Sequence, residues 1–441
     1  MLTGAAHLIA KRVAGPFWQH RRWLEQTQWL SRDQLEEIQI KQLRKLVEHC
    51  YATVPFYTQL MDEHGIKPHS IRSLEDMDQF PILNKQEVIK AGRSIISNKF
   101  PKWTLRKGRT GGSTGTPMIV YRNLDSLGTE HAFARRQWDW AGVGMREKSA
   151  WIFQRVVAGS MDKKKKLYEY DPIMRELTLS AFHCSATTAL DYAKCIKAHG
   201  IKVVVGYPSS LNLIAKTCLN AGYKLDLKVA ISTWEAMTAS MKETITKAFG
   251  CKIFDFYGSG ERVVAIHKCE HGGYHVIPEY GYTELMPVNG GNGDCFKIVS
   301  TGFWNKAMPL IRYDIGDVVT KPENCTCNCG REYTVVKSII GKEGDVIRSP
   351  SGFELGVTAV VQILYTIGGT NNVLETQIVQ DALDHITVDY VPATAFSQRD
   401  LFEMQKSAAR FLPKDLTVDF REVNAVKRTA MGKIRPIISK I

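Results

Sequence analysis

The chain has 441 residues, of which 44% are hydrophobic and 23% charged, and its formal net charge is +13. This length exceeds one ordinary domain, so we expect two or three domains with the composition of a globular protein. The sequence lacks the run of about eighteen apolar residues that a membrane-spanning helix needs. The positive charge favours anionic partners, which include nucleotides, coenzyme A, nucleic acid and anionic lipid. It does not distinguish between these classes.

The segment 1–30 is basic and amphipathic, and it has neither an uninterrupted apolar run nor a small-residue cleavage site. We therefore expect no secretory signal. A helix packed on the protein body explains the pattern, and a helix lying on a membrane surface is the alternative. Residues 31–54 predict a helix that Ser31 caps, and residues 73–92 predict further helical structure broken at Pro81.

Residues 109–123, RTGGSTGTPMIVYRN, combine glycines, serine and threonines just before the β-prone run Met118–Tyr121. Glycines let backbone amides approach a ligand closely. The hydroxyl groups of Ser and Thr can reach phosphate oxygens. Taken alone, the segment also suits an ordinary strand-joining turn.

Between about residues 100 and 320, short β-prone runs alternate with helical ones, as in VVVGYP followed by SLNLIAKTCLNAG and LKVAIST followed by MTASMKETITKAFG. This alternation predicts an α/β fold whose large N-terminal domain has mostly parallel sheets covered by helices. Ligands of such sheets bind at the carboxyl ends of the strands. We expect the turns after VVVG, AIS and IFDFYG to meet there.

The pattern changes at about residue 341, after a stretch rich in Gly, Ser and Pro that suits a hinge. We expect helices at Thr358–Thr366 and Gln398–Phe411, and strands at Glu375–Val379, His385–Tyr390 and Thr417–Val423. These elements predict a small, mobile α+β C-terminal domain. The predicted division is a helical entry region over 1–100, a core with a metal site over 101–340, and the C-terminal domain over 341–441.

Four further stretches carry groups suited to a nucleotide: FDFYGSGE, IRYDIGD, GKEGDVIR and VKRTAMGKIRP. Tyr257 offers a ring that can stack on a purine, and Glu261 a carboxylate that can hold Mg²⁺. Asp314 and Asp317 can accept hydrogen bonds from ribose hydroxyls, and Lys433 adds a positive charge after a glycine. Taken singly, each stretch also suits a charged turn or a solvated surface.

In order and spacing, these motifs resemble those of the adenylate-forming acyl-ligase superfamily, especially its branch of phenylacetate–coenzyme A ligases and capsular-polysaccharide-associated proteins. The resemblance spans essentially the whole chain. It implies that a phosphate-binding loop of ATP is formed by Thr110, Gly111, Gly112, Ser113, Thr114, Gly115 and Thr116. It also implies nucleotide contacts from Tyr257, Gly258 and Ser259, with the Tyr257 ring at the adenine.

The same resemblance implies that Glu261 holds Mg²⁺, that Asp317 binds the ribose, and that Lys433 approaches both the carboxylate and the α-phosphate. The sequence departs from the family pattern where Met118 follows Pro117 and many members have a lysine. Near the hinge, Lys342 stands where the family usually has an Arg. Gly344 stands where the family often has a carboxylate, and the carboxylate of Asp345 follows one place later.

The implied activity is ATP- and Mg²⁺-dependent conversion of a carboxylic acid into an acyl-adenylate, followed by transfer to coenzyme A. Transfer to an amine or to a protein thiol is the alternative. A nucleotide-binding scaffold without catalysis is a further hypothesis, against which Glu261, Asp317 and Lys433 argue. A zinc-dependent nucleic-acid binder comes last, and we expect no nucleic-acid partner.

The cysteines fall into two groups. Those scattered singly among apolar neighbours fit reduced core positions in a cytoplasmic protein: Cys50, Cys184, Cys195, Cys218, Cys251 and Cys295. A second group, in CEHGGYH and CTCNCGR, combines thiols and imidazole, which suit a closed tetrahedral Zn²⁺ site. Similarity to some phenylacetate-ligase relatives implies a structural zinc held by Cys269, His275, Cys327 and Cys329, with Cys325 as the alternate. Free cysteines in a reduced loop are the other interpretation.

Overall fold

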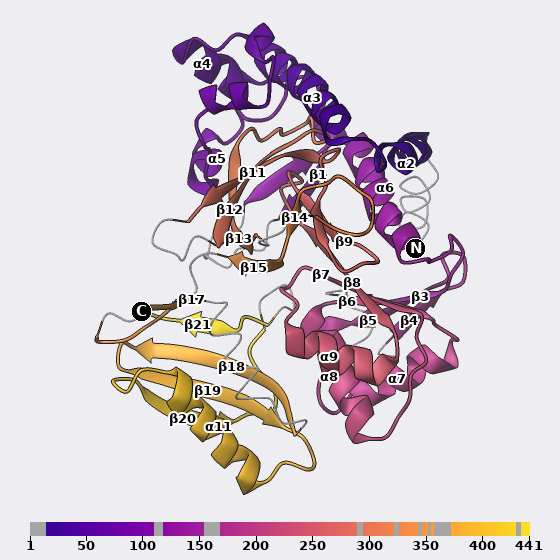
Figure 1. The fold of residues 1–441 in the computed structure, drawn as a ribbon, viewed down its shortest axis with the longest axis vertical. Coiled ribbons are helices and arrows are strands. Elements are labelled where there is room, and N and C mark those ends of the chain that lie inside the picture. The colour runs from indigo at the N-terminus through magenta and orange to yellow at the C-terminus, as the bar shows by residue number, and fades with distance from the viewer. Residues whose placement is uncertain are drawn as a thin grey trace. The chain divides into compact units, whose positions relative to one another are not determined.

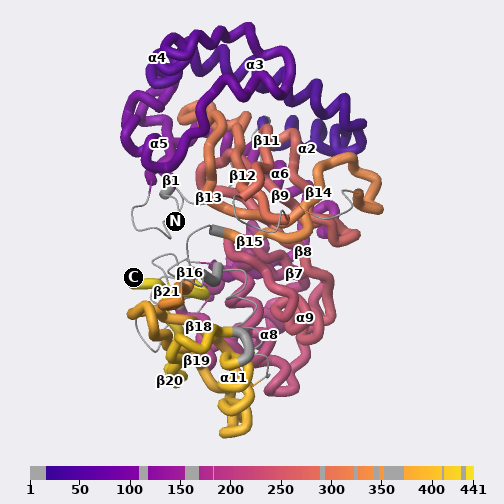
Figure 2. The backbone as a smooth tube through the Cα atoms, turned by 60° about the vertical axis from the view of Figure 1, so that its left-hand side comes forward, coloured from indigo at the N-terminus to yellow at the C-terminus, as the bar shows by residue number. Residues whose placement is uncertain are grey.

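The computed structural model describes residues 15–109, 118–153, 168–288, 294–321, 326–342, 346–351, 354–356, 372–428 and 434–441. The chain forms two units, one from residues 1–142 with 256–339 and the other from residues 143–255 with 340–441. Figure 1 labels the elements of each unit, and Figure 2 traces the course of the chain. Each unit therefore contains two stretches that are separated in the sequence.

Helices dominate the beginning of the first unit. They are α2 (Gly15–Thr27), α3 (Arg32–Thr53), α4 (Pro55–Glu63), α5 (Lys85–Ala91) and α6 (Leu124–Trp140), with 3₁₀ turns at Pro68–Ser70, Glu75–Gln79 and Lys102–Thr104. The predicted cap of α3 is confirmed, because the Ser31 hydroxyl accepts from Gln34 N and the Gln34 side chain accepts from Ser31 N. This reciprocal pair satisfies two donors that the helix leaves open.

The described part of the basic N-terminal segment is a helix packed on the protein. Helix α2 contacts α6, and Phe17 and Leu24 of α2 are buried in one apolar cluster with Phe133 of α6. The packed-helix interpretation is therefore confirmed for residues 15–27. Over the described ranges, we find no helix that is both long enough and apolar enough to cross a membrane.

The strands of the first unit pair in antiparallel fashion. The strands β1 (Arg106–Arg109) and β2 (Ile119–Arg122) form a hairpin. The strand β10 (Tyr274–Val276) pairs with β9 (Ala265–Lys268) on one side and with β14 (Val335–Val336) on the other. The strand β12 (Cys295–Gly302) lies between β11 (Gly281–Pro287) and β13 (Tyr313–Thr320) and pairs with both. The strand β8 (Lys252–Gly258) enters this unit at Phe256 and pairs with β9. The parallel pattern expected up to about residue 320 thus ends earlier, because β8 to β13 lack the crossover helices that parallel strands need.

The second unit contains the predicted parallel strands. Its strands β3 (Ser149–Phe153), β5 (Glu176–Ser180), β6 (Val203–Gly206) and β7 (Val229–Thr233) are parallel, and β4 (Tyr168–Asp171) lies antiparallel beside β5. The helices α7 (Ala189–Ala198), α8 (Pro208–Asn220) and α9 (Ala239–Phe249) join them, after a 3₁₀ turn at Ala181–His183. Every residue of β6 and β7 is buried, as expected for strands covered on both faces.

The C-terminal part of the second unit has the predicted α+β pattern. The strands β18 (Val373–Ala382), β19 (His385–Pro392), β20 (Thr417–Glu422) and β21 (Ile437–Ser439) form one sheet in the order β20-β19-β18-β21, and α11 spans Gln398–Phe411 as predicted. Two shorter strands, β16 (Val346–Arg348) and β17 (Glu354–Gly356), pair with each other, whereas β15 (Ser338–Lys342) begins in the first unit and belongs to the sheet with the order β11-β12-β13-β15. The predicted helix Thr358–Thr366 lies outside the described residues. The α/β class is confirmed, while the domain boundaries at 100 and 340 remain predictions.

Arg312 joins the N-terminal helical region to the strands of the first unit. Its guanidinium donates to the Glu284 carboxylate of β11 at 2.6 Å and to the carbonyl oxygen of Phe80 at 2.8 Å. Leu83 N in turn donates to the Arg312 carbonyl at 2.9 Å. Arg312 is buried and has a φ of 46°, a left-handed conformation that is costly for a residue other than glycine and that these contacts help to hold.

We expect Arg312→Met to lower the free energy of unfolding by about 3–5 kcal/mol, because it leaves the largely buried Glu284 carboxylate, whose side chain is 12% exposed, without its cation. Replacing both partners, as in Arg312→Met with Glu284→Leu, should recover part of this loss. Denaturant unfolding measures both effects. Lys202→Met is the control, since it removes an exposed ion pair with Asp226 and should change stability little. An equal change in Arg312→Met and Lys202→Met would contradict the assigned role.

Candidate functional site

Two of the predicted nucleotide-binding residues contact each other in the first unit. Tyr257, near the end of β8, donates its hydroxyl to Asp317 of β13 at 2.6 Å. Burial, followed by the charge of Asp317, raises the pKa of Tyr257 well above its ordinary range, so the phenol stays protonated and remains a donor. The motifs FDFYGSGE and IRYDIGD are therefore joined by a direct hydrogen bond.

Glu261 lies in the turn after β8 and contacts the same strand β13. The carboxylate is almost completely buried, and its Oε1 accepts a hydrogen bond of 3.4 Å from the Tyr313 hydroxyl. Burial and the Glu261 charge raise the pKa of Tyr313. Glu261 and Asp317 thus each accept a hydrogen bond from a tyrosine hydroxyl, and we call Tyr257, Glu261, Tyr313 and Asp317 the carboxylate cluster.

Close backbone packing fixes the turn that carries Glu261. A Cβ atom at Gly302 would lie 2.4 Å from the Arg262 carbonyl oxygen, and one at Gly281 would lie 2.5 Å from that of Val263. The Ser300 hydroxyl also donates to the Val263 carbonyl at 2.9 Å. Arg262 itself has a φ of 66°. The two glycines therefore allow strands β11 and β12 to press against this turn and hold it in a conformation that is otherwise costly.

The hairpin of β1 and β2 contacts the same turn. Arg122 of β2 donates to the Gly260 carbonyl at 2.5 Å, and a Cβ at Gly108 of β1 would lie 2.6 Å from the Arg122 guanidinium carbon. Burial, followed by the charge of Arg262, lowers the pKa of Arg122 to about 10. The predicted phosphate-binding residues Thr110–Thr116 connect these strands and lie outside the described residues. Their hairpin is nevertheless tied to the turn that precedes Glu261.

Some residues with predicted functions lie in segments outside the described part of the chain. Lys433 belongs to the segment 429–433, and Gly344 and Asp345 to the segment 343–345, all outside the described residues. Gly258 ends β8, and Ser259 follows it, with its hydroxyl accepting from Val263 N at 3.5 Å. Sequence reasoning gave no role to Arg122 or Tyr313, although both belong to quoted motifs. Only the fold reveals their contacts.

Three aromatic rings lie at the carboxyl ends of the parallel strands in the second unit. Phe153 ends β3, Tyr207 follows β6, and Trp234 follows β7. The Phe153 and Trp234 ring centroids are 4.2 Å apart, and those of Tyr207 and Trp234 are 5.7 Å apart. Tyr207 is fully buried, whereas Trp234 is 48% exposed and has a φ of 67°. An exposed ring on a strained backbone at a ligand-binding edge favours a functional position for Trp234.

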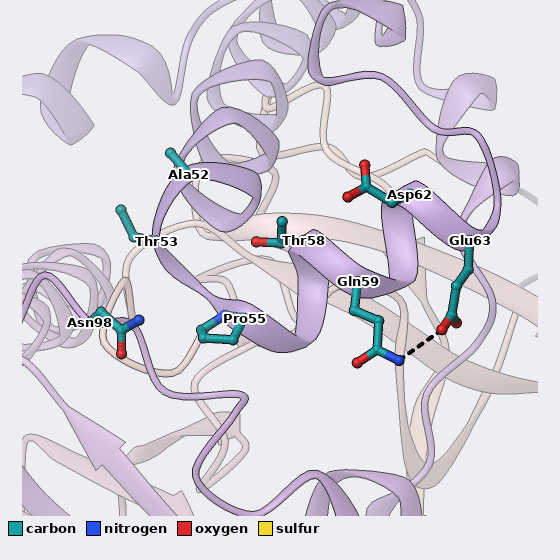
Figure 3. Close-up of a pocket in the computed structure, with 8 residues that line it drawn as sticks. All are labelled: Ala52, Thr53, Pro55, Thr58, Gln59, Asp62, Glu63 and Asn98. Atoms are coloured by element: carbon teal, nitrogen blue, oxygen red, sulfur yellow. Dashed lines mark hydrogen bonds between the residues drawn. The ribbon is translucent and has the colours of Figure 1, made fainter.

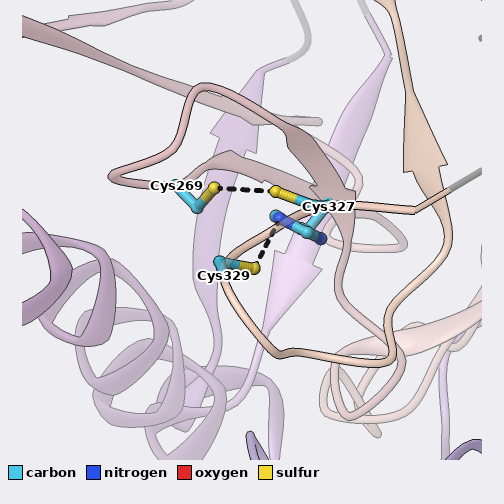
Figure 4. A group of neighbouring side chains, drawn as sticks. Cys269, Cys327 and Cys329 are labelled. Atoms are coloured by element: carbon cyan, nitrogen blue, oxygen red, sulfur yellow. Dashed lines mark hydrogen bonds between the residues drawn. The ribbon is translucent and has the colours of Figure 1, made fainter.

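The predicted zinc ligands converge in the first unit, and Figure 4 labels the three cysteines among them. Their ligand atoms all lie within 4.8 Å of one another: Cys269, His275, Cys327 and Cys329. The Cys269 and Cys327 sulfurs are 3.6 Å apart, and the Cys329 sulfur is 3.4 Å from His275 Nε2. A tetrahedral zinc with Zn–S bonds of about 2.3 Å requires sulfur separations of about 3.8 Å. Cys325 lies outside the described residues.

The surroundings of this Cys/His cluster fit a metal ion. Burial, followed by the charges of Arg331 and Arg136, lowers the pKa of His275 to about 4, so its ring is neutral and can coordinate. Burial raises the pKa of the Cys269 thiol to about 12, so a metal would have to displace that proton. A Cβ at Gly273 would lie 2.8 Å from the Cys327 sulfur. Gly273 therefore makes room for this ligand.

The single cysteines differ from the cluster. Cys50, Cys184, Cys218 and Cys251 are buried as predicted, whereas Cys195 and Cys295 are partly exposed. Burial raises the pKa of Cys184, Cys218 and Cys251 to about 12 in each case. Such thiols are poor nucleophiles and suit a core role.

A separate pocket of about 530 Å³ lies beside α4 in the first unit (Figure 3). It is lined by Ala52, Thr53, Pro55, Thr58, Gln59, Asp62, Glu63 and Asn98, with a hydrogen bond of 2.7 Å from Gln59 to Glu63. This lining comes from the helical entry region. It is distinct from the motifs that form the carboxylate cluster.

The chain is similar to several known proteins in sequence and in fold. Residues 354–440 match the family model of the CapK C-terminal domain. The chain is 26% identical to protein CapK of Staphylococcus aureus over 92% of this chain and 90% of that protein. It is 24% identical to a phenylacetate–coenzyme A ligase of Thermus thermophilus over 75% of this chain and 76% of that enzyme.

Its fold matches a crystal structure of 2-hydroxyisobutyryl-CoA ligase in the postadenylation state in complex with R3-HIB-AMP. The TM-score is 0.73 at 17% identity, and the match covers 94% of this chain and 92% of that one. The expected resemblance is thereby confirmed: the chain has the fold of the adenylate-forming ligases and is similar in sequence to the branch that contains CapK and the phenylacetate–coenzyme A ligases.

Proposed function

We propose that this protein activates a carboxylic acid with ATP and Mg²⁺ as an acyl-adenylate, releases pyrophosphate and transfers the acyl group to coenzyme A. The observation that carries the proposal is the carboxylate cluster, in which hydrogen bonds from Tyr257 to Asp317 and from Tyr313 to Glu261 join two distant motifs. The similarity to phenylacetate–coenzyme A ligases supports it.

The reaction requires two anions to approach each other. A carboxylate oxygen attacks the α-phosphorus of ATP, the bond from phosphorus to the bridging oxygen breaks, and pyrophosphate leaves. In the second step the thiol of coenzyme A loses its proton, its sulfur attacks the acyl carbon, and AMP departs with the former carboxylate oxygen. We assign Lys433 to neutralising charge in the first step, where such a contact contributes about 3 kcal/mol.

The carboxylate cluster suits the nucleotide end of this reaction. Mg²⁺ binds through one or two carboxylates together with waters and phosphate oxygens, and Glu261 supplies one such carboxylate. When bound, Mg²⁺ would offset the phosphate charge. The Tyr257 hydroxyl holds Asp317 in place for the ribose, and we assign Thr110–Thr116 to the phosphates. An adenine would lie against the Tyr257 ring.

A second candidate exists for the molecule that accepts the acyl group. Similarity to CapK extends over nearly the whole chain, which keeps transfer to an amine or a protein thiol as the alternative. Product mass spectrometry with and without coenzyme A separates the two. An acyl-coenzyme A product supports the first, and an amide or protein-bound product formed without coenzyme A supports the second. The cytoplasmic location remains a prediction.

We also assign a structural zinc ion to Cys269, His275, Cys327 and Cys329. Three thiolates and one imidazole complete a tetrahedral set, which leaves no ligand position for a substrate. The ligands come from the segments around β9 and β10 and from the chain before β14. Bound zinc would therefore tie the segment following the Glu261 turn to the chain that leads out of the first unit.

Lys433→Ala should lower acid-dependent pyrophosphate release by about a hundredfold or more, because one cationic contact to the transition state is lost. The assay mixes protein, ATP, Mg²⁺ and a panel of carboxylic acids. Lys440→Ala removes an exposed lysine near the same chain end and should leave the rate unchanged. Full activity in Lys433→Ala would overturn the assignment.

Asp317→Asn should raise the KM for ATP about tenfold, since a hydrogen bond from the ribose to a charged group is weakened. Tyr257→Phe should raise it by a smaller factor, because Asp317 keeps its charge and loses only its tyrosine donor. Tyr51→Phe is a matched control, because it removes a surface tyrosine–carboxylate hydrogen bond of 3.0 Å to Asp62. If all three variants behave alike, Asp317 does not bind the nucleotide.

Gly273→Ala should lower the zinc content to less than about half an equivalent, because the added methyl group displaces the Cys327 thiolate from the tetrahedral set. Metal analysis and the absorption of the cobalt-substituted protein both report this change. Cys295→Ser, which alters a cysteine outside the cluster, should leave the metal content unaffected. Wild-type protein purified without chelator and free of zinc would contradict the zinc proposal.

A further inference from the structure

A row of basic residues stands at the amino ends of three parallel strands in the second unit. Lys148 directly precedes β3, Arg175 precedes β5 and Lys202 precedes β6. The first residue of β3 is paired in register with the first residues of both β5 and β6. The three basic residues therefore lie at one level of the sheet, with about 4.8 Å between neighbouring strands.

An open pocket of about 590 Å³ lies at this edge of the sheet. Its lining contains Arg146 as well as the three residues of the row. Among the described residues that line it, Glu147 is the one carboxylate, and it accepts a bond of 2.7 Å from Lys228, which precedes β7. Ligands of parallel sheets usually bind at the other edge, where Trp234 lies. The pocket thus carries a net positive charge that the predicted nucleotide site does not explain.

The two lysines have structural partners. Lys148 Nζ donates to the His199 carbonyl oxygen at the end of α7, at 3.1 Å. A cation is favourable there, because the last carbonyl groups of a helix carry partial negative charge. Lys202 Nζ donates to the Asp226 carboxylate at 2.7 Å. Packing and ion pairing therefore account for these lysines, although each ammonium group has three donors and keeps some of them for a ligand.

The two arginines differ from the lysines in this respect. Over the described ranges, neither the Arg146 nor the Arg175 guanidinium is joined to another residue by a hydrogen bond or an ion pair. Arg175 also has a φ of 56°, a left-handed conformation that glycine adopts without strain. The turn before β5 therefore holds an arginine at a free-energy cost, which is a feature of functional positions.

The chemistry of the lining favours phosphate groups. A guanidinium presents paired N–H donors that match the oxygens of a phosphate. Two strand intervals, about 10 Å in all, separate Arg175 from Lys202, so the row can contact more than one phosphate group of the same molecule. The pocket volume also lies within the range typical of small-molecule sites.

We propose that this pocket binds a small molecule with two phosphate groups, a diphosphate or a bisphosphate, and that Arg146 and Arg175 donate to its phosphate oxygens. The bound molecule would lie at the amino edge of the parallel sheet. The inference does not depend on the proposed function, because none of these residues belongs to the predicted nucleotide site.

Arginine modification tests the proposal at the pocket itself. Phenylglyoxal modifies guanidinium groups, mass spectrometry locates the modified residues, and inorganic pyrophosphate without added Mg²⁺ is the probe. Below about 1 mM, pyrophosphate should halve the modification rates of Arg146 and Arg175. Arg93 and Arg399, which are exposed elsewhere, are internal controls whose rates should not change. Because the readout is local, pyrophosphate bound at the predicted nucleotide site cannot produce this result.

Equal protection of all four arginines, or protection of none, would overturn the proposal. Protection that requires more than about 10 mM pyrophosphate would indicate an adventitious ion only and would also overturn it. Orthophosphate should protect about tenfold less well, because it supplies one phosphate group. Stronger protection by single-stranded RNA or by phosphatidylglycerol vesicles would indicate a macromolecular surface and would contradict a small-molecule site.

A double variant provides a second measurement by equilibrium dialysis with labelled pyrophosphate. Arg146→Gln with Arg175→Gln should weaken binding at this pocket by at least about tenfold, and so remove one bound pyrophosphate per chain near 1 mM. Arg93→Gln with Arg399→Gln removes the same charge elsewhere and should bind as wild type does. An unchanged thermal unfolding transition verifies that each variant is folded. Equal binding by the two double variants would overturn the proposal.

Discussion

Two acidic side chains, Glu261 in the turn after β8 and Asp317 of β13, constrain the rest of the first unit. A carboxylate in a buried or partly buried place needs donors or a cation. Here the hydroxyls of Tyr313 and Tyr257 supply one donor to each. The turn that carries Glu261 can form only because Gly281 and Gly302 leave space for its backbone. Under the proposed function, Mg²⁺ and the ribose hydroxyls would be further partners of these two carboxylates.

In the second unit, side chains distant in the sequence contact the residues on either side of the segment 429–433, which contains Lys433. A lysine side chain has many rotamers, so its useful position depends on where its backbone is held. Gln377 of the C-terminal sheet donates to the carbonyl oxygens of Lys427 and Arg435, and Glu235, which follows β7, accepts from Ile434 N.

Local sequence patterns predicted the parts of the structure that depend on short-range chemistry. The hydrophobic runs of β6 and β7, the Ser31 cap and the helix Gln398–Phe411 are confirmed, because period and capping are encoded by neighbouring residues. Family motifs also led to the thiols and imidazole that converge. The contacts of Arg122, Arg312 and Glu235 were not predicted, since each bonds to residues distant in the sequence. Assignments to Thr110–Thr116 and Lys433 remain predictions, because these residues lie outside the described ranges.

The central claim is that an oxygen of the acid becomes bonded to the α-phosphorus of ATP, and labelled oxygen tests it directly. A carboxylic acid that supports turnover is labelled with ¹⁸O in both carboxyl oxygens, and the nucleotide product is analysed by mass spectrometry. The account predicts AMP carrying one ¹⁸O atom, with unlabelled pyrophosphate. ADP together with ¹⁸O in inorganic phosphate would instead indicate an acyl-phosphate intermediate and would contradict the account.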